Sequence, residues 1–150
     1  MPELIVQSCS KSKKKVSQPL SAFSLYSGYY YSIIKKAMEE GEYRDELDIC
    51  IISAKYGLLE KEEEIEPYDR RMDKERAEEL RPEIAPQLRK KINSHDYDRV
   101  ILNLGQEYRH AVRGFESGID TEVLELEGGL GERGHELKKI IRNDLRSQKA

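Results

Sequence analysis

Four short apolar runs along the chain are each predicted to form a buried β-strand. The two middle runs, "LDICIIS" and "RVILNL", are apolar almost throughout, which is typical of a parallel strand with both faces covered. The first and last runs are shorter, and we expect them nearer an edge of the sheet. The four predicted strands are Glu3–Ser8, Leu47–Ser53, Arg99–Leu104 and Glu122–Leu126.

Helical patterns follow each of these strands. Between residues 27 and 40, for example, Ile33, Ile34 and Ala37 recur at the spacing of one helix face. Pro82 and Pro86 are expected to break or kink the longest helix, because proline lacks the N–H that a helix interior needs. The predicted helices are Ser27–Glu40, Asp73–Ile92, Gln106–Phe115 and His135–Leu145.

The alternation of strand and helix predicts a single α/β domain over residues 1–150. We expect a three-layer sandwich, in which helices cover both faces of a mainly parallel, Rossmann-like sheet of about four strands. The connections should be right-handed crossovers.

Composition narrows the possible functions. The 150 residues carry a net charge of −3, which disfavours a protein that coats nucleic acid by bulk charge, although nucleic acid stays possible as a local partner. No apolar run approaches transmembrane length, so we expect no membrane contact and a cytoplasmic location. Two cysteines, Cys9 and Cys50, make no disulfide framework, and no zinc-type spacing exists. We therefore expect neither a metal nor a cofactor.

The loops that follow the four strands are expected to form one ligand site. In an open parallel sheet these loops gather at the carboxyl edge, where ligands bind. All four contain small residues that permit close backbone approach, whereas the loops at the opposite edge are ordinary polar connectors. The four loops are Ser8–Lys13, Ser53–Leu58, Gly105–Tyr108 and Gly128–Gly134.

The first loop, "SCSKSK", offers the most chemistry. Ser8 and Ser10 carry hydroxyl donors, and Lys11 and Lys13 carry positive charge for a phosphate or carboxylate. Clustered ammonium groups repel one another, which makes a nucleophilic amine more available. Cys9 is a candidate nucleophile, a binding-loop residue or a packed structural thiol.

A phosphatase loop is disfavoured, because the arginine that such a loop requires is replaced by a lysine. Such enzymes place an arginine after five residues that follow the loop cysteine, and Lys15 occupies that position here. Lysine lacks the planar fork that grips a phosphoryl group.

The stretch "GLGERG" satisfies the pattern G-x-G-x-x-G between a strand and a helix. A dinucleotide site is disfavoured, because no further βα unit follows. Two interpretations stay open: Gly129 and Gly131 cradle a phosphate or carbonyl, or they form a turn that lets a helix pack closely.

Asp69 in "EPYDRR" is a candidate base or orienting group, or alternatively the cap of the helix that follows. Tyr56 suits the stacking of a base at the rim of the site, and Tyr68 either joins it or packs internally. The remaining candidates for ligand binding at these loops are Ser53, Lys55, Gly57, Gly105 and Tyr108.

Taken in order, the motifs "SCSKSK", "LYSGYYYSIIKKAM", "ISAKYGLL", "PYD", "NLGQEY" and "LEGGLGERGHELK" resemble an uncharacterised prokaryotic domain-of-unknown-function family, over roughly Val6 to Leu137. The first motif is also distantly similar to the Cys-x-x-x-Lys motif of the archaeosine synthases, enzymes of tRNA 7-deazaguanine modification. Cys9 and Lys13 match that motif, whereas Lys14 and Lys15 replace its Pro-Tyr. The resemblance implies an α/β fold and a ligand of nucleobase or nucleotide type.

Three functions follow as hypotheses. In the first, the protein is an enzyme, a transferase or hydrolase, that acts on a nucleobase, nucleoside or nucleotide with Cys9, Lys13 and Asp69 at its centre. In the second, the same pocket belongs to a non-catalytic nucleotide-binding or sensing module. In the third, the charged helix Asp73–Ile92 docks another protein.

Overall fold

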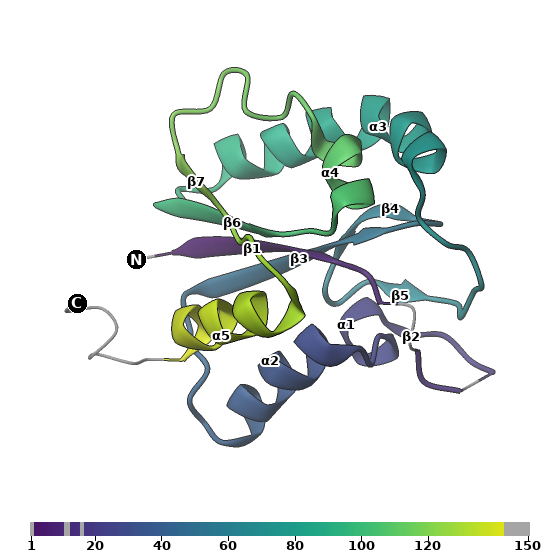
Figure 1. Cartoon of the computed structure of the whole chain (residues 1–150), viewed down its shortest axis with the longest axis vertical. Coiled ribbons are helices and arrows are strands. Elements are labelled where there is room, and N and C mark those ends of the chain that lie inside the picture. Colours follow the sequence, from purple (N-terminus) through teal and green to yellow (C-terminus); the bar gives the residue numbers. More distant parts are fainter. Residues whose placement is uncertain (1, 11–12, 16, 143–150) are drawn as a thin grey trace.

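A computed structural model describes residues 2–10, 13–15 and 17–142. Its centre is a five-stranded sheet with the strand order β4-β3-β1-β6-β7 (Figure 1). Strand β4 is antiparallel to β3, and the other neighbouring pairs are parallel. The predicted α/β class with a mainly parallel sheet is therefore confirmed. The strands are β1 Glu3–Ser8, β3 Leu47–Ser53, β4 Gly57–Glu60, β6 Arg99–Asn103 and β7 Glu122–Glu125.

Strand β1 lies in the middle of the sheet, between β3 and β6. Every one of its six residues is buried, and Ile5 stands opposite Ile49 on one side and Ile101 on the other. The expectation that the first strand lies nearer an edge is wrong, because its shortness does not stop it from pairing on both sides. Strand β7 does form an edge.

Strand β4 was not predicted, and it makes the sheet one strand larger than expected. Three residues, 54–56, connect β3 to β4, and Ser53 pairs with Gly57 across the turn. Gly57 has φ +79°, a left-handed conformation that glycine adopts without strain. The stretch read as a ligand loop is thus a tight hairpin.

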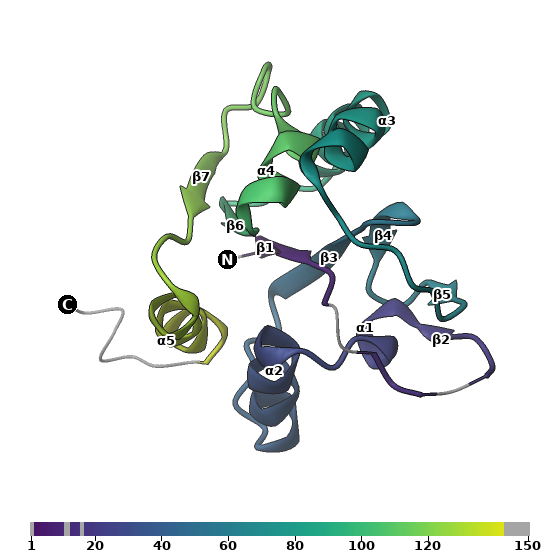
Figure 2. The same ribbon diagram turned by 45° about the vertical axis from the view of Figure 1, so that its right-hand side comes forward.

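Helices lie on both faces of this sheet. The helices α3 (Lys74–Ser94) and α4 (Gln106–Val112) cover one face, and α2 (Tyr29–Glu39) and α5 (Leu130–Ile141) cover the other (Figures 1 and 2). No helix among the residues described above is long and apolar enough to cross a membrane.

Helix α3 runs without interruption through Pro82 and Pro86, so the expected break is wrong. Its apolar side is held by the core, where Ile84 and Leu88 are fully buried, and packing of this kind outweighs the loss of a few backbone hydrogen bonds.

Helix α5 begins five residues earlier than predicted and contains Gly131 and Gly134. A Cβ atom at Gly134 would lie 2.5 Å from the hydroxyl oxygen of Tyr29 on α2. Part of "GLGERG" therefore serves close helix packing, which favours the second of the two interpretations of this stretch.

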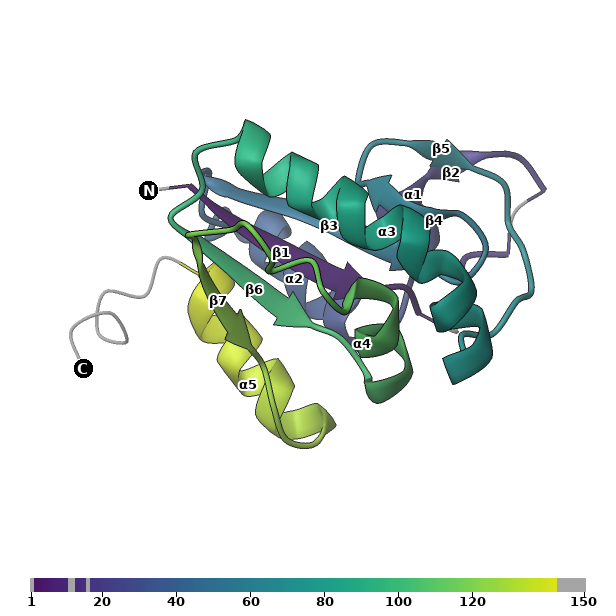
Figure 3. The ribbon, with the colours of Figure 1, turned by 90° about the horizontal axis from the view of Figure 1, so that it is seen from above.

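A small two-stranded ladder lies beyond the edge of the main sheet. It pairs β2 (Leu20–Ser21) with β5 (Glu64–Ile65), and the short helix α1 (Ala22–Leu25) follows β2 (Figure 3). This ladder carries the segment after β5 back toward the loop that follows β1.

Candidate functional site

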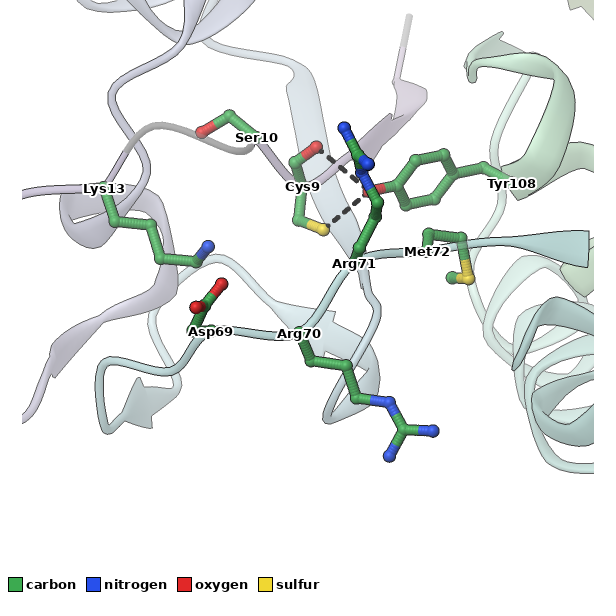
Figure 4. A pocket seen from close by; sticks show the side chains of 8 residues that line it. All are labelled: Cys9, Ser10, Lys13, Asp69, Arg70, Arg71, Met72 and Tyr108. Atoms are coloured by element: carbon green, nitrogen blue, oxygen red, sulfur yellow. Dashed lines mark hydrogen bonds between the residues drawn. The ribbon is translucent and has the colours of Figure 1, made fainter. Parts of the chain in front are cut away.

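A pocket of about 450 Å³ opens at the carboxyl edge of the sheet (Figure 4). Three parts of the chain build it: the loop after β1, the segment between β5 and α3, and helix α4. We call it the basic pocket. Its lining residues are Cys9, Ser10, Lys13, Asp69, Arg70, Arg71, Met72 and Tyr108.

Cys9 sits against Tyr108 in this pocket. The sulfur of Cys9 lies 3.0 Å from the hydroxyl oxygen of Tyr108, which also donates a hydrogen bond of 3.4 Å to the Cys9 carbonyl oxygen. Burial raises the pKa of Tyr108, and the neighbouring Cys9 raises it further, so the phenol stays protonated at neutral pH. The Cys9 amide donates to the carbonyl of Ile52, and only 9% of Cys9 is exposed. The thiol is therefore fixed in position beside a permanent hydroxyl donor.

Lys13 approaches the pocket from the other side. Its ammonium nitrogen lies 4.5 Å from the ring centroid of Tyr68 and 5.9 Å from that of Tyr26. Its backbone forms an antiparallel bridge with Tyr26. Figure 4 shows the Lys13 side chain extending toward Asp69. Two aromatic rings and a backbone bridge thus hold this cation in the pocket.

A buried hydroxyl network supports those two rings. The hydroxyl oxygen of Tyr68 lies 2.7 Å from that of Tyr26 and 3.0 Å from Oγ of Ser53. Oγ of Ser53 also accepts the backbone N–H groups of Lys55 and Tyr56. Burial raises the pKa of both Tyr26 and Tyr68, so the network is neutral at physiological pH. It acts as a scaffold that positions Lys13.

Two arginines make the pocket positively charged. A guanidinium nitrogen of Arg70 lies 3.8 Å from a carboxylate oxygen of Glu79, and the Arg70 side chain points away from Cys9 in Figure 4. The Arg71 side chain lies near Cys9 and Tyr108 in the same view. No carboxylate in the described part of the chain is within salt-bridge distance of Arg71. Because Arg70 is paired with Glu79, the positive charge inside the pocket comes chiefly from Lys13 and Arg71, against the single carboxylate of Asp69. The pocket therefore suits an anionic ligand.

Five of the residues proposed from the sequence line the basic pocket. Ser8 lines a neighbouring pocket. Ser53 and Tyr68 do not line the basic pocket, but they are hydrogen-bonded to each other, and the Tyr68 ring packs against Lys13, which does line it. Tyr56 packs edge-on against Tyr68, with ring centroids 5.6 Å apart. Lys11 lies outside the described residues. The five residues in the pocket are Cys9, Ser10, Lys13, Asp69 and Tyr108.

The proposed glycines line neither this pocket nor its neighbour. Gly57 forms the hairpin turn, and Gly105 is the N-cap of α4. Gly129 is the N-cap of α5 and donates its N–H to Glu132 of the same helix, while Gly131 is an exposed residue within that helix. The structure thus places these glycines in a turn, at two helix N-termini and within a helix, outside the two pockets.

The structure places Lys55 outside the pockets and contradicts one interpretation of Asp69. Lys55 is exposed outside both pockets, and its ammonium nitrogen lies 5.1 Å from the ring centroid of Tyr56. Asp69 does not cap α3, because Asp73 is the N-cap and accepts the N–H of Arg76. Asp69 is left to face the pocket.

Sequence reasoning missed Tyr26, Arg70, Arg71 and Met72. Tyr26 stands in an apolar stretch, and nothing local distinguishes it from a core residue. The arginines directly follow the "PYD" motif, so their charge was a usable signal once that motif was placed at the site. Among residues 2–10, 13–15 and 17–142 there is no group of three or more side chains suited to a metal ion.

Comparison with known proteins supports the fold and assigns a family. The crystal structure of AF0587, a protein of unknown function, aligns with a TM-score of 0.58 and 14% sequence identity over 95% of this chain. The aligned region covers 45% of the AF0587 chain, so the present chain spans under half its length. No curated protein matches the sequence. The sequence profile of a family of unknown function (DUF6884) matches residues 4–139, and the chain therefore belongs to that family.

Proposed function

We propose that this protein is an enzyme that acts on a nucleobase, nucleoside or nucleotide bound in the basic pocket. The observation that carries the proposal is the meeting of Cys9, Lys13 and Tyr108 in one positively charged pocket at the carboxyl edge of the sheet. Nucleotides are anionic, and their bases carry electrophilic carbons that a thiol can attack.

Each residue has a role that its surroundings support. Cys9 loses its proton and forms a bond to an electrophilic carbon of the ligand, and the leaving group departs with a proton. Water or an amine then displaces the sulfur and restores the thiol, which gives hydrolysis or group transfer. Once the sulfur has lost its proton, the Tyr108 hydroxyl 3.0 Å away donates a hydrogen bond to it, and Lys13 supplies positive charge in the same pocket. Asp69 orients Lys13 or the ligand.

The test is product formation. The protein is incubated with nucleobases, 7-deazaguanines, nucleosides and nucleoside monophosphates, each with water or an amine as acceptor, and products are identified by mass spectrometry. Cys9→Ala and Lys13→Ala should each lower turnover roughly a hundredfold or more. Lys15→Ala is the matched control, because Lys15 is exposed and lines neither pocket. Full turnover in both pocket variants would refute the catalytic assignment.

A second candidate function is a non-catalytic nucleotide-binding or sensing module. The burial of Cys9 favours it, because a thiol that is only 9% exposed and bonded to Tyr108 serves as a fixed wall of a pocket. Saturable binding of a nucleotide without any product, unchanged by Cys9→Ala, would select this candidate.

We further infer a three-layer, Rossmann-like class for the fold and a cytoplasmic location. The similarity of Cys9 and Lys13 to the archaeosine synthase motif supports a base of the modified-guanine type and a link to tRNA modification. In the third hypothesis, another protein docks on helix α3. Because Ala77, Leu80 and Ile84 are buried in the core, such a partner would bind the charged, solvent-facing side of that helix.

A further inference from the structure

A second, smaller pocket shares Cys9 and Ser10 with the basic pocket. It has a volume of about 240 Å³ and lies against the amino-terminal ends of α2 and α5. We call it the tyrosine pocket. Its lining residues are Gln7, Ser8, Cys9, Ser10, Gly28, Tyr29, Tyr30, Tyr31 and Leu130.

Flat aromatic surfaces dominate the tyrosine pocket. The rings of Tyr29 and Tyr30 meet edge to face with centroids 5.4 Å apart, and the guanidinium of Arg133 lies 5.0 Å from the Tyr30 centroid. Tyr29 is 44% exposed and Leu130 is 57% exposed, so both side chains present apolar surface at the rim of this pocket. Rings of this kind suit a planar aromatic ligand.

Polar groups at the base of the tyrosine pocket suit the edge of such a ring. The hydroxyl oxygen of Tyr30 is buried and has no hydrogen-bond partner among the described residues. Such a group normally finds a partner, in the protein, in water or in a ligand. Gln7 is fully buried in the floor, where its side chain accepts a 2.8 Å hydrogen bond from Asn103. Asn103 in turn accepts a 2.9 Å bond from Arg133, so the floor is rigid.

The two pockets differ in charge and in size. None of the residues that line the tyrosine pocket carries a formal charge, whereas the basic pocket has three cations and one carboxylate. Pockets that enclose a whole drug-sized ligand measure about 300–1,000 Å³. The tyrosine pocket falls below that range, so it is large enough for one part of such a ligand.

We propose that the two pockets hold the two halves of one nucleoside monophosphate. The base lies in the tyrosine pocket, and the phosphate lies in the basic pocket beside Arg71 and Lys13. Cys9 and Ser10 form the wall between them and contact the sugar or the base edge. The inference rests on the proposed function and narrows its substrate class from nucleobase, nucleoside or nucleotide to a phosphorylated nucleoside.

The experiment is a cycle of ligands and variants measured by calorimetric titration. The ligands are the four common nucleoside 5′-monophosphates, the four matching nucleosides and inorganic phosphate. The variants are Arg71→Ala in the basic pocket and Leu130→Trp, which fills the tyrosine pocket from its exposed rim. Arg81→Ala and Met38→Trp are the matched controls, because the Arg81 side chain is 41% exposed, Met38 is 36% exposed, and neither residue lines either pocket.

Wild-type protein should bind at least one monophosphate roughly tenfold or more tightly than its nucleoside, the usual gain from charge-assisted hydrogen bonds. Arg71→Ala should remove most of that gain and leave nucleoside binding unchanged. Leu130→Trp should weaken the nucleoside and its monophosphate by the same factor. Inorganic phosphate should compete with the monophosphate and not with the nucleoside. The control variants should resemble the wild type.

Different failures have different meanings. If nucleosides bind and a phosphate adds nothing, the two-pocket inference is overturned while the proposed function stands. If Leu130→Trp changes the affinity for neither the nucleoside nor its monophosphate, the base does not lie in the tyrosine pocket. Leu130→Phe replaces this variant if circular dichroism shows the tryptophan variant to be unfolded. If none of the nine ligands binds, the two-pocket inference is overturned. The proposed function is refuted as well if the nucleobases and 7-deazaguanines of the product assay also neither bind nor react.

Discussion

Ser53→Ala tests whether the hydroxyl network behind the basic pocket holds the site together. Oγ of Ser53 is fully buried and takes part in three hydrogen bonds. It accepts the N–H of Lys55 at 3.2 Å and of Tyr56 at 3.0 Å, and it lies 3.0 Å from the hydroxyl oxygen of Tyr68. Alanine keeps the strand and removes all three contacts.

The expected loss of stability follows from these contacts. A net contribution of about 1 kcal/mol per hydrogen bond gives roughly 3 kcal/mol. The loss of stability is smaller if the Tyr68 hydroxyl keeps its 2.7 Å hydrogen bond with the Tyr26 hydroxyl. It is larger if the N–H of Lys55 or Tyr56 stays buried without a partner. We therefore expect the free energy of unfolding to fall by about 2–4 kcal/mol. Since Tyr68 carries the ring under Lys13, ligand binding in the basic pocket should weaken as well.

Urea unfolding followed by circular dichroism measures this change. Ser94→Ala is the control, since Ser94 is exposed and bonds only the carbonyl of Lys90 at the end of α3, and its effect should stay within about 0.5 kcal/mol. If Ser53→Ala matches the control in stability, the network contributes little and the proposed support of Lys13 is wrong.

Three further results are expected. Burial raises the pKa of Tyr26 and Tyr31 above 10.0, so both stay protonated in the folded state where the unfolded chain already loses the proton. The free energy of unfolding should therefore be constant below pH 10 and fall above it by roughly 1.4 kcal/mol per pH unit for each tyrosine. Urea unfolding midpoints that stay unchanged between pH 8 and 11 would contradict this. Gly131→Ala should raise the free energy of unfolding by up to about 1 kcal/mol, and with it the melting temperature, because its Cβ would enter open space within a helix. Nucleotide affinity should stay unchanged, and weaker binding would instead support a phosphate contact at Gly131. Gly28→Ala should cost about 1–3 kcal/mol and weaken binding, because its Cβ would lie 2.6 Å from Cβ of Ser10; a calorimetric scan and titration equal to wild type would disprove the close packing there.

The sequence alone predicted the main strands and the edge at which the pocket lies. Apolar runs identify β1, β3, β6 and β7 to within a residue or two, because buried parallel strands leave little room for polar side chains. Strand order was beyond reach of this reasoning. Nothing in the six residues of β1 distinguishes a central strand from one at an edge, since its neighbours come from distant parts of the chain.

The site was predictable where it lies next to a strand and unpredictable where it depends on long-range pairing. Cys9 follows β1 directly, and Tyr108 opens the helix after β6. The role of the glycines stayed open because a G-x-G-x-x-G pattern fits both a phosphate loop and a tightly packed helix. Only the structure favours the packed helix, because a Cβ at Gly134 would lie 2.5 Å from the hydroxyl oxygen of Tyr29 and clash with it. Arg71 reaches the pocket through the β2–β5 ladder, which has two residues per strand and no recognisable pattern.

The arrangement of the lysines explains why a buried strand leads straight into a cluster of positive charge. The amide of Lys14 donates to the carbonyl of Leu25, and Lys13 bridges to Tyr26, so the chain is pinned along α1 immediately after the loop. This pinning turns Lys13 into the pocket, while Lys14 and Lys15 are exposed. Of these three lysines, only Lys13, four residues after Cys9, lines the basic pocket. If the proposed enzyme activity exists, Cys9 and Lys13 serve the same step from one loop, and the double variant Cys9→Ala/Lys13→Ala should lose little more activity than either single variant; additive losses in turnover would show that the two act independently.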